Sequence, residues 1–172
     1  MAQGVVLEFD AATDGAVRAC WRELEAAGVP SLESFTHGRH EPHVSLVVAD
    51  RLVVGDWLAT LRDEFFAGDP LRVSLTGVAT FPGGWVYLAV EGLPRAGHTR
   101  LVSSLGRDAE GIWEHYLPRE WVSHCTLAGG LTEQQAQTAA TSVRTSWPPS
   151  TTIAGAALVD ADTGHIQRLP VP

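Results

Sequence analysis

The sequence predicts an α+β fold made of two similar halves, and three observations support this prediction. Apolar segments with strand and helix periodicity follow the order strand, helix, strand, helix, strand, and this order occurs twice. The first strands of the two halves, at Val5 and Trp85, begin 80 positions apart, and two similar histidine segments, at His43 and His124, lie 81 positions apart. Turn residues at 82–84 separate the halves. A period of this length that occurs only twice indicates a duplicated lobe rather than a solenoid.

In the first half we expect strands at residues 5–10, 42–48 and 71–81. Two helices are expected between them, the first capped by Thr13 or Asp14 and ended by Gly28, the second capped by Asp56. The apolar positions at helical spacing are Val17, Cys20 or Trp21, and Leu24 in the first helix, and Trp57, Leu58, Leu61 and Phe65 in the second.

The second half repeats this order, with strands expected at residues 85–92, 123–130 and 151–159 and a hairpin to 166–169. Pro94 favours the start of a helix through Leu101 and Leu105. Thr132 and Gln135 have the spacing of a capping box, which predicts the start of a second helix.

Length and composition are those of one soluble domain. With 172 residues, of which 45% are hydrophobic and 19% charged, the chain can bury a core. We therefore expect a single domain over residues 1–172, with lobe one at about 1–81 and lobe two at about 82–172. We expect a monomer.

The net charge and the cysteine content indicate which binding partners and which cellular compartment to expect. A formal net charge of −8 disfavours sequence-independent binding of long nucleic acid, which needs many phosphate contacts. Cys20 and Cys125 are too few for a disulfide framework and are expected to be buried thiols. No signal sequence and no apolar run long enough to span a membrane is seen, so the expected location is the cytoplasm.

The two histidine segments, PHVSLVV and SHCTLAGG, share one pattern. In each, a histidine is followed two positions later by a hydroxyl residue, giving the pairs His43 with Ser45 and His124 with Thr126. Side chains alternate between the faces of a strand, so each histidine shares a face with its hydroxyl partner. Composition alone predicts about one such triplet by chance. Both copies, however, lie in apolar strands at the same place in the repeat, which indicates a shared site.

These two segments resemble the paired His-x-Thr/Ser motifs of the two-histidine (2H) phosphoesterase superfamily, which includes 2′-5′ RNA ligase-like proteins and cyclic phosphodiesterases. The resemblance covers nearly the whole chain. It implies a bilobal duplicated β-α-β-α-β fold with pseudo-twofold symmetry, curved antiparallel sheets around a central cleft, and helices outside. It also implies a metal-independent reaction on a small cyclic phosphodiester, such as a 2′,3′-cyclic nucleotide, an RNA end or an ADP-ribose cyclic phosphate.

The resemblance implies that His43 and His124 are the catalytic residues and that Ser45 and Thr126 bind the phosphate. Histidine can remove a proton from water or supply one to a leaving oxygen near neutral pH, and hydroxyls can stabilise the charge on the phosphate oxygens. By resemblance alone, His124 is assigned as the base and His43 as the acid. The chain departs from its relatives after the second motif, where Ala128, Gly129 and Gly130 replace an arginine found in several RNA-acting members. This favours a small substrate.

Two alternative functions fit the same segments: RNA 2′-5′ ligation or its reverse, and a non-catalytic module that binds nucleotides or RNA ends. Arg39 and Tyr116 are candidate substrate-binding residues. The spacing of His37, His40 and His43 could suggest a metal, but the run crosses a loop and contains a proline, so we expect no metal and no cofactor. The remaining expectations are surface positions for His98, His115 and His165, and core positions for Trp21, Trp57, Phe65, Trp85 and Trp121.

Overall fold

The computed structural model describes residues 2–143 and 146–172 and confirms the α+β prediction. The helices are α1 (Ala11–Ala26), α2 (Trp57–Phe65), α3 (Arg95–Leu105) and α4 (Glu133–Ser142). The strands are β1 (Gln3–Phe9), β2 (His43–Leu52), β3 (Arg72–Phe81), β4 (Trp85–Glu91), β5 (Ala109–Ile112), β6 (His124–Ala128), β7 (Thr151–Asp160) and β8 (Ile166–Arg168). The strands of this described part pair antiparallel in the order β5-β2-β1-β7-β3-β4-β6, and β8 pairs with β7.

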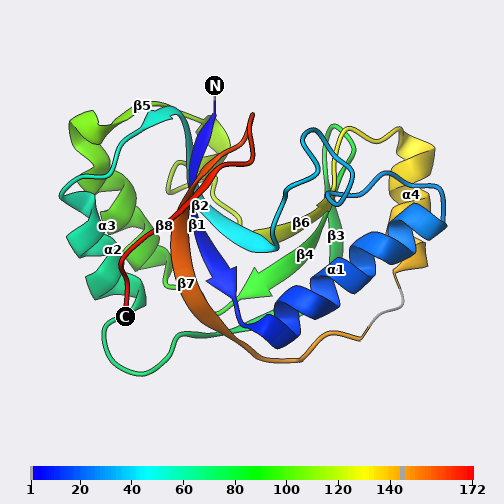
Figure 1. Cartoon of the computed structure of the whole chain (residues 1–172), viewed down its shortest axis with the longest axis horizontal. Coiled ribbons are helices and arrows are strands. Elements are labelled where there is room, and N and C mark those ends of the chain that lie inside the picture. The colour runs from blue at the N-terminus through cyan, green and yellow to red at the C-terminus, as the bar shows by residue number, and fades with distance from the viewer. Residues whose placement is uncertain (1, 144–145) are drawn as a thin grey trace.

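The sheet curls, and the helices lie on its outer side (Figure 1). Helices α2 and α3 contact each other on one side of the molecule, and α1 and α4 contact each other on the other side. We call the helix-free face of the curled sheet the concave face. Residues on this face are free of helix packing and are available for a site.

The two halves of the sequence exchange strands in the sheet. Strand β7, from the second half, pairs with β1, whereas β3, from the first half, pairs with β4. Strand β5 also crosses over, because it pairs with β2. The lobe boundary near residue 82 stays a prediction from the sequence, and strand pairing runs across it.

Helix ends follow local sequence signals. Helix α1 begins earlier than expected, because Asp10 is its N-cap and accepts a hydrogen bond from the Thr13 amide. The Thr13 side chain is buried instead and donates to Thr151. Gly28 adopts a φ of 76°, the left-handed conformation predicted after α1. The capping box of Thr132 and Gln135 at α4 is confirmed.

The core confirms most of the expected buried aromatic residues. Trp21, Trp57, Phe65 and Trp121 are buried. The prediction for Trp85 was wrong, since 39% of this residue is exposed. Trp85 lies at the start of β4 on the face opposite to the core-facing Val86, so strand alternation turns its side chain away from the core.

Candidate active site

Strands β2 and β6 contact each other although each pairs with other strands in the sheet. Along both strands the apolar residues are buried, namely Val44, Leu46, Cys125 and Leu127. The alternate residues, His43 and Ser45 on β2 and His124 and Thr126 on β6, are only partly buried. Because side chains alternate across a strand, these four residues lie on the concave face. Two contacting strands thus supply the two histidines and two hydroxyls.

Each imidazole is held by the same local contact. His43 Nδ1 lies 2.6 Å from the Glu41 carbonyl oxygen, and His124 Nδ1 lies 2.7 Å from the Val122 carbonyl oxygen. A carbonyl oxygen can only accept, so Nδ1 carries the proton and donates in both cases. The neutral form therefore has its lone pair on Nε2. In both rings Nε2 is the atom that can take or give a proton.

Two buried indoles bind the backbone of the hydroxyl residues. Trp121 Nε1 donates to the Ser45 carbonyl oxygen at 3.0 Å, and Trp21 Nε1 donates to the Thr126 carbonyl oxygen at 3.3 Å. Each tryptophan comes from the opposite half of the sequence to the strand that it holds. These reciprocal bonds stabilise the relative position of the two strands, and sequence spacing does not reveal them.

Burial lowers the pKa of both imidazoles, but their charged neighbours differ. At His43, burial is the largest cause, and the hydrogen bond to the Glu41 carbonyl and the negative charge of Glu41 act in the opposite direction. At His124, burial is again the largest cause, the Val122 carbonyl opposes it, and positive charge on His43 lowers the pKa further. The two imidazoles therefore interact electrostatically, and only at His43 does a neighbouring carboxylate, Glu41, oppose the effect of burial on the pKa.

Aromatic side chains that were not assigned to the site from the sequence flank His124. Phe81 and Tyr87 stack on each other with ring centroids 4.0 Å apart. Their centroids lie 5.0 and 5.3 Å from that of His124, both in edge-to-face geometry. The sheet register explains this cluster, because Tyr87 is the partner of Thr126 and Ala89 is the partner of His124. The only sequence signal for Tyr87 is alternation along β4, which becomes informative once the neighbouring strand is known, and Phe81 comes from the end of β3.

Of the two predicted binding residues, Tyr116 lies beside Ser45. It ends the short 3₁₀ helix η2 (Glu114–Tyr116), which contacts β2. Burial raises the pKa of Tyr116, and a hydrogen bond with Ser45 partly offsets this rise. The phenol is therefore neutral near pH 7 and hydrogen-bonds with a hydroxyl of the candidate site.

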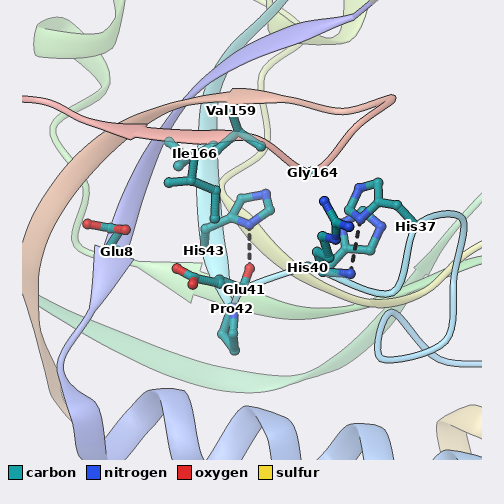
Figure 2. Close-up of a pocket in the computed structure, with 11 residues that line it drawn as sticks. Glu8, His37, His40, Glu41, Pro42, His43, Val159, Gly164 and Ile166 are labelled. Carbon is teal, nitrogen blue, oxygen red and sulfur yellow. Dashed lines mark hydrogen bonds between the residues drawn. The ribbon is translucent and has the colours of Figure 1, made fainter.

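Arg39 lines a small pocket that also contains His43. Figure 2 shows His43 in this pocket together with Glu41 and His37. The residues that line this pocket are Val6, Glu8, His37, Arg39, His40, Glu41, Pro42, His43, Val159, Gly164 and Ile166. Neither His124 nor Thr126 lines it, so the pocket adjoins the histidine pair without containing it. The Arg39 amide donates to His37 Nδ1, so the proton of the neutral His37 ring is on Nε2, which is buried and has no partner among the described residues.

Charged residues surround His43 from two neighbouring strands. Glu8 on β1 is the register partner of His43. Arg168 on β8 forms ion pairs with Glu8 at 3.3 Å and with Glu41 at 3.0 Å. Burial raises the pKa of Glu8, and the Arg168 charge opposes this. Both carboxylates beside His43 are thus partly neutralised by one guanidinium.

The predicted surface position of His98 was wrong. His98 is buried, its ring stacks on Trp121 with centroids 3.9 Å apart, and its Nε2 donates to the Leu46 carbonyl oxygen at 2.8 Å. Helix α3 packs its inner side against the sheet, and His98 lies on that side with Leu101 and Leu105. Its role is to hold Trp121, which in turn holds Ser45. The loop histidines His115 and His165 are exposed, as predicted.

We expect the stability of the fold to fall as pH falls from 7 to 5. Burial is the first cause that lowers the pKa of His40, to about 4, and it also lowers the pKa of His43, His98 and His124. In the unfolded chain these imidazoles have their ordinary pKa near 6.5, whereas in the folded chain they take up protons only at lower pH. Their stabilising effect is complete above pH 6.5 and is lost as pH falls toward the folded pKa values. Urea unfolding at pH 7 and pH 5 measures this, and His40→Gln should weaken the dependence; equal stability at both values would contradict it.

Within residues 2–143 and 146–172, no group of three His, Cys, Asp or Glu side chains is arranged to hold a metal ion. No helix in this part of the chain is long and apolar enough to cross a membrane.

Burial raises the pKa of the Cys125 thiol to about 12, so a thiolate nucleophile beside His124 is disfavoured.

Comparisons with known proteins agree with this architecture. The model of a family described as the 2′-5′ RNA ligase superfamily matches residues 13–165. The solved structure of Usb1 from Kluyveromyces marxianus is similar in fold, with a TM-score of 0.50 and 11% sequence identity, over 99% of this chain and 98% of that chain. At this identity the likeness shows the fold alone. A comparison with curated proteins gives no match.

Proposed function

The chain belongs to the 2′-5′ RNA ligase superfamily, and from this premise we propose that it is a metal-independent phosphodiesterase that opens a cyclic phosphodiester by two-histidine acid/base catalysis. The observation that carries this proposal is the matched pair of imidazoles on contacting strands. Each donates through Nδ1 to a backbone carbonyl, so that each has Nε2 as its reactive atom. Such a pair suits a reaction that removes one proton and supplies another.

In the proposed reaction, Nε2 of neutral His124 takes a proton from water. The water oxygen attacks phosphorus, and one phosphorus–oxygen bond of the ring breaks. Protonated His43 gives its Nε2 proton to the departing oxygen, so the products are a phosphomonoester and a free hydroxyl. The Glu41 charge, which favours protonation of His43, supports its assignment as the acid. The aromatic surroundings of His124, its burial and the positive charge of His43, both of which lower the pKa of His124, support its assignment as the base.

The hydroxyls of Ser45 and Thr126 would donate to the non-bridging phosphate oxygens, where negative charge grows in the transition state. Tyr116 would orient the Ser45 hydroxyl through their hydrogen bond. Arg39, which is exposed beside His43, would attract the anionic substrate rather than take part in the chemistry.

Family membership also favours a second reaction at the same residues. If the 5′-hydroxyl of a second nucleotide replaces water as the attacking group on a 2′,3′-cyclic phosphate, and the 3′-oxygen leaves, the same acid and base form a 2′-5′ linkage. In the reverse reaction the 3′-hydroxyl attacks that linkage and the 5′-oxygen leaves. The two reactions differ only in the atom that attacks phosphorus. Product analysis therefore separates them.

We expect the purified protein, with EDTA present, to convert a cyclic phosphodiester into a phosphomonoester. The panel is 2′,3′-cyclic nucleotides, ADP-ribose 1″,2″-cyclic phosphate and 2′-5′ dinucleotides. Reaction in ¹⁸O-labelled water should place one labelled oxygen on phosphorus, as ³¹P NMR can detect. Formation of a 2′-5′ linkage without label would favour ligation. Saturable nucleotide binding without turnover, or activity that the chelator abolishes, would refute the proposed mechanism.

A further inference from the structure

We propose that Trp85 is the platform on which the nucleobase of the substrate stacks. This inference rests on the proposed function, because it assigns a nucleotide as the substrate class of that site. Trp85 is a large aromatic residue that is partly exposed at the edge of the concave face.

The alternation of β4 places Trp85 on the same face as the histidine pair. Val86, Leu88 and Val90 are buried in the core, so the alternate residues Trp85, Tyr87 and Ala89 point to the concave face. Their partners on β6 agree with this orientation, since Tyr87 is opposite Thr126 and Ala89 is opposite His124. Trp85 therefore continues the row that begins at the candidate base.

The indole of Trp85 packs against Gly129. A Cβ added to Gly129 would lie 2.3 Å from Trp85 Cζ3 and 2.5 Å from its Cε3, so only glycine leaves room for the ring. Gly129 has no positive φ, so its glycine requirement comes from this contact rather than from backbone conformation. Phe35 lies edge-to-face with Trp85 at a centroid distance of 6.0 Å. Gly129 and Phe35 thus pack against the ring, and 39% of the Trp85 residue stays exposed.

The position of this platform suits a base attached to the reacting phosphate. Trp85 lies two residues along β4 from Tyr87, which is about 7 Å at the usual rise of a strand. Tyr87 and Phe81 contact His124, so a phosphate at His124 places the rest of a nucleotide along this row. Every base has a π-face, and stacking on an aromatic ring needs no charged side chain. The adjoining end of β6, Ala128 to Gly130, supplies none.

The test compares two substrates in four variants. The substrates are a purine nucleoside 2′,3′-cyclic phosphate and the 2′,3′-cyclic phosphate of 1-O-methylribose, which lacks a base. The variants are Trp85→Ala, Trp85→Phe, Gly129→Ala and Trp113→Ala. Trp113 is the matched control, because it is also an exposed tryptophan but hydrogen-bonds Asp50 near the end of β2 farthest from His43.

For Trp85→Ala, we expect KM for the cyclic nucleotide to rise by roughly 5- to 100-fold, the range expected for loss of one base–aromatic stack. Its kcat should change little, and KM for the base-free substrate should not change. Trp85→Phe should restore most of the affinity, Gly129→Ala should mimic Trp85→Ala, and Trp113→Ala should behave as wild type. An equal rise of KM for both substrates, or none for either, would overturn the inference. A wild-type protein inactive on both substrates would refute the nucleotide assignment, and inactivity on the whole panel would instead refute the proposed function.

Discussion

His124→Ala is expected to lower kcat by about 10²- to 10⁴-fold, and His43→Ala to do the same, because each removes one proton-transfer group from the reaction. The His98 ring is buried against Trp121 and the Tyr116 phenol has its pKa raised by burial, so neither is expected to replace the lost Nε2. Initial rates with the best substrate of the panel measure the effect. His165→Ala, which removes an exposed histidine of the β7–β8 turn, is the matched control and should retain activity.

The pH profile of kcat/KM gives the same prediction a second readout. A neutral base and a protonated acid produce a bell-shaped profile. Because burial lowers the pKa of both histidines in the free protein, we expect the bell to be centred below pH 6.5. Glu41→Gln removes the charge that favours protonation of His43, so the alkaline limb should move to lower pH. An alkaline limb unaffected by Glu41→Gln would contradict the assignment of His43 as the acid, and full activity of either alanine variant would refute the mechanism.

Removing the hydroxyls is expected to have the second largest effect. Ser45→Ala and Thr126→Val should each lower kcat by about 10²- to 10³-fold, the usual cost of losing one donor to transition-state charge. KM should change less, because the bond strengthens as charge develops on the phosphate oxygens. Single-turnover kinetics at saturating protein separate the chemical step from binding.

Two kinds of variant sharpen the hydroxyl test. Ser45→Thr and Thr126→Ser keep a hydroxyl at the same place and should retain much of the activity. Ser123→Ala is the control, because the Ser123 hydroxyl donates to the Val90 carbonyl and not toward the candidate site. If Ser45→Ala and Thr126→Val keep wild-type kcat, the two hydroxyls do not bind the reacting phosphate.

The order of elements could be predicted from the sequence because its signals are local. Glycine, proline and capping residues mark the ends of the helices, and apolar periodicity distinguishes helix from strand. The exception is β5, a four-residue strand held by pairing with β2, which has no periodicity of its own. The N-cap of α1 was misassigned because Asp10, Thr13 and Asp14 are all acceptable cap residues, and only the fold shows that Thr13 bonds with Thr151.

The site could be predicted only in part. That His43 shares a face with Ser45, and His124 with Thr126, follows from strand alternation alone, and so does the inward direction of Cys125. The aromatic neighbours of His124, and the contact of Tyr116 with Ser45, depend on which strands and loops become adjacent in the folded chain. Such adjacency is a long-range property, which residue spacing does not carry.

The sequence by itself therefore determined the order of the helices and strands apart from β5, the family and the two matched histidine–hydroxyl pairs, since each depends on residues close together in the chain. Only the tertiary structure decided that the two halves exchange β3 and β7, that Trp21 and Trp121 hold the opposite strands, and that Trp85 lies on Gly129 at the concave face. The physical reason is that hydrogen bonds and side-chain contacts between distant residues form only once the sheet register is set. Register depends on the packing of the whole core rather than on any single segment.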